Sequence, residues 1–162
     1  MTANTLQLAA QLGQLLLTRH WHISCAESCT GGGIGYAITA ISGSSAWFKQ
    51  GIISYANEAK ENLLNVDRHT LVTYGAVSQQ TVEAMAQGAA MLANAQVAVA
   101  VSGIAGPDGG SVEKPVGTVW FGFFVDGEVT SSCQLFTGDR QSVREQAVDF
   151  ALQQTRILME KH

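Results

Sequence analysis

The sequence predicts one α/β domain over residues 1–162, built on a mixed β-sheet. Segments with apolar residues at helical spacing alternate with short apolar runs, which is the pattern of helices packed on a sheet. Residues 97–101, VAVAV, are apolar throughout and predict a central strand covered on both faces. Asp126-Gly127 lies between two further apolar segments and predicts a hairpin, whose strands are antiparallel. The sheet is therefore expected to be mixed.

The first half of the chain alternates helix and strand. Residues 4–19 carry leucine and alanine at helical spacing and predict an amphipathic helix. A short apolar run predicts a strand at 21–26, and the glycines that follow it begin a helix expected at 31–41. A Ser/Gly loop separates that helix from a strand expected at 48–55.

Two helices are expected before the central strand. The first runs from Asn57 to Leu64 and the second over residues 79–93. Asn57 and Ser78 are their expected N-caps, because short polar side chains accept hydrogen bonds from the free N–H groups of a first helical turn.

The second half contains the hairpin and a final helix. A glycine-rich loop at 103–117 follows the central strand, and the hairpin strands are expected at 118–125 and 128–136. Apolar residues at helical spacing predict the last helix at 139–160.

Composition excludes several classes of protein. With 46% hydrophobic and 14% charged residues, the chain can bury enough apolar surface to fold. A net charge of −4 argues against general nucleic-acid binding, which needs a basic face. The sequence has neither a signal peptide pattern nor a run of membrane-spanning length, so we expect a soluble cytoplasmic protein with no membrane partner. The three cysteines form no disulfide or zinc pattern and are expected to be buried and reduced.

Two glycine-rich turns are the candidate binding loops. AESCTGGG, residues 26–33, and SGIAGPDGG, residues 102–110, both follow predicted strands, where α/β sheets bind ligands. The first also begins a helix, whose N–H groups suit an anion. Neither loop has the pattern of a Walker A or a dinucleotide-binding motif. These features predict a site for a phosphorylated small molecule.

The sequence places a serine–lysine pair better than a histidine triad, while serine, tyrosine and lysine near a turn are also typical of solvated surface. Ser28 lacks a G-x-S-x-G frame, and Cys29 has no evident histidine partner. Residues 42–60 carry three serines in a loop, then Tyr55 and Lys60. A lysine whose pKa is lowered can take a serine proton, but the pattern does not choose among Ser42, Ser44 and Ser45.

Two arginines begin the last predicted helix. Arg140 and Arg144 are four residues apart and face the same way. They form either an exposed charged face or a clamp for phosphate or carboxylate.

Taken together, AESCTGG, GSSAWFKQGIISYANEAK, GAVS, SGIAGPDGGSVEKPVGTVW and FTGDRQSVREQA resemble the stand-alone members of the CinA C-terminal domain family. The resemblance runs from about residue 5 to 155. It implies a three-layer α/β/α fold with a mixed sheet. It also implies hydrolysis of the carboxamide of nicotinamide mononucleotide (NMN) to nicotinate mononucleotide and ammonia, with no metal or organic cofactor.

The resemblance also implies roles for individual residues. Ser45 is the expected nucleophile, Lys60 its base and Tyr55 an aid to proton transfer. Glu27 is expected to orient the first glycine loop or a polar group of the ligand. The other residues expected to bind the substrate are Ser28, Thr30, Gly31, Ser102, Gly103, Ala105, Gly106 and Arg140.

Two alternatives to this function remain open. The enzyme could act on another nucleotide-like amide, or the chain could be a non-catalytic nucleotide-binding or regulatory module of the same fold. The complete set of Ser45, Tyr55 and Lys60 favours catalysis. The aromatic segment 120–124 is either wholly core or contributes in part to a subunit interface; the second alternative predicts a homo-oligomer, with a dimer expected before larger assemblies.

Overall fold

One five-stranded mixed sheet organises the protein, and a computed structural model describes it over residues 1–162. The strand order is β2-β1-β3-β4-β5. β1 pairs in parallel with both β2 and β3, and the hairpin strands β4 and β5 add antiparallel pairs. The mixed sheet is therefore confirmed. The strand bounds are β1 Ile23–Glu27, β2 Phe48–Ile53, β3 Val97–Gly103, β4 Thr118–Val125 and β5 Glu128–Leu135.

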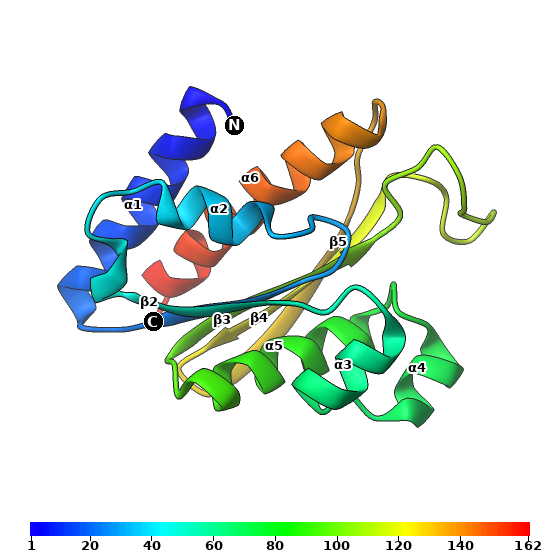
Figure 1. Ribbon diagram of the computed structural model, residues 1–162, viewed down its shortest axis with the longest axis horizontal. Coiled ribbons are helices and arrows are strands. Elements are labelled where there is room, and N and C mark those ends of the chain that lie inside the picture. The colour runs from blue at the N-terminus through cyan, green and yellow to red at the C-terminus, as the bar shows by residue number, and fades with distance from the viewer.

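Helices cover both faces of this sheet in three layers (Figure 1). One layer contains α1, Ala3–Arg19, α2, Gly33–Thr39, and α6, Arg140–Glu160. The opposite layer contains α3, Asn57–Leu64, α4, Arg68–Tyr74, and α5, Gln79–Ala93. The α/β/α arrangement that the resemblance implied is confirmed.

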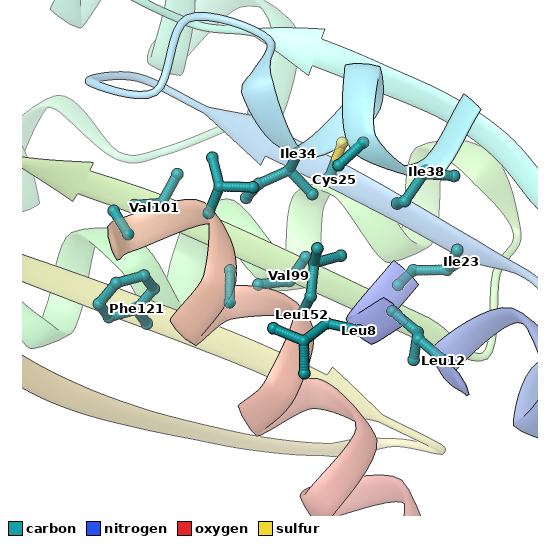
Figure 2. Close-up of a cluster of buried hydrophobic side chains, with 14 of the residues drawn as sticks. Leu8, Leu12, Ile23, Cys25, Ile34, Ile38, Val99, Val101, Phe121 and Leu152 are labelled. Carbon is teal, nitrogen blue, oxygen red and sulfur yellow. The ribbon is translucent and has the colours of Figure 1, made fainter. Parts of the chain in front are cut away.

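The central strand explains why the two layers differ. In β3 the valines Val97, Val99 and Val101 pack toward α1, α2 and α6, in the larger core cluster that Figure 2 shows in part. Ala98 and Ala100 face α5 on the other side. The side chains of the apolar run VAVAV thus alternate between large on one face and small on the other. The small alanines let α5 approach the sheet closely. A Cβ built on Gly122 of β4 would lie only 2.0 Å from the Val82 carbonyl oxygen of α5.

The predicted hairpin turn and the predicted N-cap at Ser78 are confirmed. Asp126 and Gly127 adopt positive φ angles of 48° and 90° and join β4 to β5. α5 begins at Gln79, and Ser78 Oγ accepts a hydrogen bond from Thr81 N. These residues determine their own backbone conformation and therefore needed no tertiary information.

Three local predictions are corrected, and one helix is added. Asn57 is the first residue of α3 rather than its cap, and Ala56 occupies the N-cap without a side-chain bond. α4 was not predicted, although Asp67 caps it by accepting from His69 N. The strand expected to reach residue 55 ends at Ile53. Cys133 is exposed on edge strand β5, whereas Cys25 and Cys29 are buried.

None of the helices combines the length with the apolar character that crossing a bilayer requires.

Candidate active site

The parallel part of the sheet brings three chain segments together at one edge. Glu27 at the end of β1 pairs with Ile53 of β2 and with Val101 of β3. The residues that follow these three positions in the chain are therefore neighbours, as expected at the carboxyl ends of parallel strands. A pocket of about 230 Å³ opens at this edge. It is lined by Ser28, Cys29, Tyr55, Lys60, Ala76, Val77, Ser102, Gly103, Ala105 and Arg140.

A buried lysine forms the base of this pocket. Lys60, in the first turn of α3, is only 1% exposed. Its Nζ lies 2.8 Å from the Ser54 carbonyl oxygen, 3.2 Å from the Tyr55 carbonyl oxygen and 3.1 Å from Ser28 Oγ. No carboxylate pairs with it. Burial lowers the pKa of Lys60, because the charged amine is desolvated, although its interaction with Cys29 opposes part of this shift.

The contacts of Lys60 fit a neutral amine that acts as a base. A neutral amine has two N–H donors and one lone pair. The two carbonyl oxygens can accept both donors, which leaves the lone pair for the hydroxyl of Ser28. The position of Lys60 near the positive end of the α3 dipole further favours the neutral form. This arrangement can take a proton from Ser28.

Two backbone hydrogen bonds hold Ser28 at the start of the turn after β1. Its backbone N donates to the Val101 carbonyl oxygen at 3.0 Å, which continues the pairing of β1 with β3. Its own carbonyl oxygen accepts from Gly31 N at 3.0 Å and closes the turn. The hydroxyl lies in the pocket lining and contacts Lys60. A serine in this position has the immediate strand-to-turn setting of an activated nucleophile.

The predicted partner of Lys60, Ser45, lies elsewhere. Ser45 is exposed in the short 3₁₀ helix Ser44–Ala46, which precedes β2. Lys60 comes after the other end of β2, and the strand's six residues span about 20 Å at ~3.3 Å per residue. The predicted Ser45–Lys60 pairing is therefore corrected, and the structure pairs Lys60 with Ser28. Sequence proximity was misleading because an extended strand separates its two ends.

Tyr55 contacts Lys60 through its backbone rather than its ring. The side chain is 61% exposed, and its hydroxyl lies 3.4 Å from Arg140 Nη2. Only the Tyr55 carbonyl oxygen reaches Lys60 Nζ. The Tyr55 hydroxyl was expected to help proton transfer, but it forms no hydrogen bond with Lys60 or Ser28 in this structure.

Arg140 ties the second glycine loop to the pocket mouth. Its Nη1 donates to the Gly106 carbonyl oxygen at 2.8 Å, and its guanidinium lines the pocket. Ser102, Gly103 and Ala105 line the same wall. Gly106 itself contributes through this carbonyl oxygen. The structure thus brings the predicted residues of the second loop and Arg140 together around one cavity.

Glu27 supports the turn from below. It is 2% exposed and absent from the pocket lining. Its Oε1 accepts from Thr30 Oγ1 at 2.6 Å and from Ile34 N at 2.9 Å, and its Oε2 accepts from Gly35 N at 3.0 Å. These contacts fit the loop-orienting alternative for Glu27. They also correct the expected anion site at the start of α2, because a carboxylate of the chain already holds those N–H groups.

The three consecutive glycines let this turn pack against α6. Gly31 and Gly32 have φ angles of +59° and +102°, which favour glycine. A Cβ on Gly31 would lie 3.2 Å from Arg144 Nη2, and one on Gly33 would lie 2.8 Å from Val148 Cγ2. Thr30 and Gly31 therefore belong to the wall that supports Ser28, and neither lines the pocket that contains Lys60.

Cys29 follows Ser28 but is unsuited to be the nucleophile. Burial raises the pKa of its thiol to about 11, so it is protonated at neutral pH. No group of three or more His, Cys, Asp or Glu side chains is placed to hold a metal ion. Ser28 was expected to bind the substrate and not to contact Lys60; the available signal for the contact was its position directly after a strand that neighbours β2.

Comparisons with known proteins agree with this architecture. The model of the CinA C-terminal domain matches residues 5–159. A nicotinamide-nucleotide amidohydrolase PncC of Enterobacter agglomerans is 57% identical over 148 residues, which cover 91% of this chain and 90% of that protein. The PncC protein of Escherichia coli K12 is 52% identical over 149 residues, with the same two coverages. The crystal structure of the competence/damage inducible protein CihA from Agrobacterium tumefaciens superposes with a TM-score of 0.94 at 40% identity, covering 99% of this chain and 98% of that one.

Proposed function

The chain belongs to the CinA C-terminal domain family, and we propose that it is an amidohydrolase that converts NMN and water into nicotinate mononucleotide and ammonia. Relatives named nicotinamide-nucleotide amidohydrolases are 50–57% identical over about nine-tenths of both chains, which supports this activity. The observation that carries the chemistry is the 3.1 Å contact between Lys60 Nζ and Ser28 Oγ at the base of a pocket.

In the proposed mechanism Ser28 is the nucleophile and Lys60 the base. Lys60 takes the hydroxyl proton as Ser28 Oγ attacks the carboxamide carbon. The resulting tetrahedral oxyanion needs hydrogen-bond donors, and the Cys29 N–H is suitable because no backbone oxygen accepts it. In strand–turn–helix nucleophile sites the residue after the nucleophile supplies such a donor.

The second half of the reaction returns the enzyme to its starting state. Protonated Lys60 gives its proton to the amide nitrogen, the C–N bond breaks, and ammonia is released. The acyl group remains bound to Ser28 Oγ as an ester. Water then attacks the ester carbonyl while Lys60 again takes the proton. Collapse of the second intermediate breaks the bond to Ser28 Oγ, which takes the proton back from Lys60, and releases the carboxylate product. Lys60 thus acts as base and acid in turn.

Arg140 is the proposed contact for the substrate phosphate. It is the only cation besides Lys60 in the pocket lining, and its guanidinium lies at the mouth between Gly106 and Tyr55. The forked donors of arginine suit a phosphate. Binding the phosphate there would orient the carboxamide toward Ser28 and reduce the entropy cost of attack.

Ammonia release from NMN by matched serine variants tests this assignment. We expect Ser28→Ala to lower kcat by about 10⁴-fold or more, as loss of a nucleophile does, and Ser45→Ala to stay near wild type. Thermal unfolding of both variants checks that the fold is intact. If Ser45→Ala is the inactive variant and Ser28→Ala is active, Ser28 is not the nucleophile.

Two substrate comparisons test the alternatives. A nucleotide-binding module would be stabilised by NMN in a thermal-shift assay but would release no ammonia at any enzyme concentration. An enzyme for another amide would not prefer NMN over nicotinamide riboside and nicotinamide. With Arg140 as the phosphate contact, we expect a strong preference for NMN, which Arg140→Ala weakens.

Location and assembly are part of the same proposal. We place the protein in the cytoplasm, where a reduced Cys133 and a nucleotide substrate are compatible with its chemistry. We also propose a homodimer. Cell fractionation and sedimentation of the purified chain test these two points.

A further inference from the structure

Arg144 directs its guanidinium at the backbone of the Ser28 turn. It lies on α6, and its Nε donates to the Cys29 carbonyl oxygen at 3.0 Å. Its Nη2 lies 3.4 Å from the Thr30 carbonyl oxygen. No carboxylate forms an ion pair with it. Arg144 does not line the pocket that contains Lys60, so its donors act on the turn and not on that cavity.

These contacts determine how one peptide group is turned. The peptide between Cys29 and Thr30 is trans, so its C=O and N–H point in opposite directions. Because the Cys29 carbonyl oxygen points at Arg144, the Thr30 N–H points away from α6. No backbone oxygen accepts this N–H, whereas the next one, of Gly31, is already bonded to the Ser28 carbonyl oxygen.

The turn therefore offers two consecutive N–H groups that no backbone oxygen accepts, those of Cys29 and Thr30, directly after Ser28. An oxyanion is best stabilised by donors that are oriented before the reaction, and of these two residues only Cys29 lines the pocket that contains Lys60. We propose that Arg144 is a positioning residue: by holding the Cys29 carbonyl oxygen it fixes Cys29, which lines the pocket, so that the Cys29 N–H is oriented as the oxyanion donor. This inference rests on the proposed function, with Ser28 as nucleophile.

The proposal gives Arg144 a role different from a substrate clamp. An arginine that bound the substrate phosphate would change KM when removed. A residue that orients an oxyanion donor acts only as negative charge develops, so its loss lowers kcat and leaves KM nearly unchanged. A change in kcat alone therefore indicates the positioning role, and a change in KM alone indicates phosphate binding.

Kinetics on three variants with NMN provide the test. Removing one oxyanion donor costs about 10²–10³ in kcat, so Arg144→Ala is expected to lower kcat by about 100-fold. Arg144→Lys should recover part of this loss, because an ammonium can donate to one carbonyl oxygen. Arg156→Ala is the matched control, since Arg156 lies on the same helix and pairs with Glu160 far from the turn. It should keep wild-type kcat.

A structural readout keeps this test independent of the proposed function. The amide proton resonances of Cys29 and Thr30 should move in Arg144→Ala and not in Arg156→Ala, because only the first frees the 29–30 peptide. Unchanged resonances, or a raised KM with unchanged kcat, would overturn the positioning role. If the wild type releases no ammonia from NMN, the proposed function fails, while the amide resonances still decide whether Arg144 orients the peptide.

Discussion

Replacing Lys60 with methionine is the sharpest perturbation of the proposed chemistry. Methionine keeps an unbranched side chain of similar length in a site that is only 1% exposed, and it removes the amine. The substitution deletes the contacts of Nζ with Ser28 Oγ, the Ser54 carbonyl oxygen and the Tyr55 carbonyl oxygen. Positioned general bases contribute about 10²–10⁴ in rate. At ~1.36 kcal/mol per factor of ten, Lys60→Met should raise the barrier by about 3–5 kcal/mol.

The pH dependence of the wild type tests the same residue without a substitution. Only the neutral amine can accept the Ser28 proton. Since burial lowers the pKa of Lys60 from its ordinary 10.5, kcat/KM for ammonia release should rise with pH and level off below pH 10.5. The Lys60→Met variant should lose this limb of the profile. A variant with wild-type kcat/KM, or a wild-type profile that is flat, would refute Lys60 as the base.

Stability should respond to pH with a defined sign. Between the lowered pKa of folded Lys60 and the ordinary value of 10.5, the unfolded chain binds more protons than the folded protein. The free energy of unfolding of the wild type therefore rises with pH in this window, relative to Lys60→Met. Urea unfolding of both proteins at several pH values measures the difference. A difference that is constant, or that changes in the opposite direction, would contradict the desolvated amine.

Three further predictions concern the turn and the thiols. Gly31→Ala should destabilise the protein by about 1–2 kcal/mol, because alanine is strained at a φ of +59°, and should lower kcat by displacing the turn; urea unfolding and ammonia release measure the two effects. Glu27→Gln should lower the free energy of unfolding by about 1–3 kcal/mol, because an amide cannot accept all three hydrogen bonds. An unchanged free energy of unfolding would mean that the Glu27 carboxylate does not stabilise the turn. Iodoacetamide at pH 8 should modify exposed Cys133 before buried Cys29 and leave ammonia release intact, as peptide mapping beside the assay would show; inactivation in step with alkylation would point to a thiol mechanism.

Caps and turns that are set by neighbouring residues could be predicted from the sequence. Features that depend on residues far away in the chain could not. Ser78 and Asp126-Gly127 act on their immediate neighbours, and the cap and the turn lie where they were predicted. The start of α3 was misplaced by one residue, because Ala56 and not the polar Asn57 takes the cap position. α4 was missed because it is short, and little in its own sequence separates it from a loop.

By itself, the sequence predicted the mixed α/β sheet, the edge of the sheet that carries the pocket, and Lys60 as a residue of the site. Apolar periodicity and glycine turns act through local conformation and burial, so they can be read without the fold. Only the tertiary structure decided which serine faces Lys60. Ser45 is nearer in sequence but lies beyond the far end of an extended strand, whereas Ser28, 32 residues away, is brought to Lys60 by the parallel pairing of β1 with β2. Strand pairing, which is a property of two segments and not of one, placed Ser28 beside Lys60.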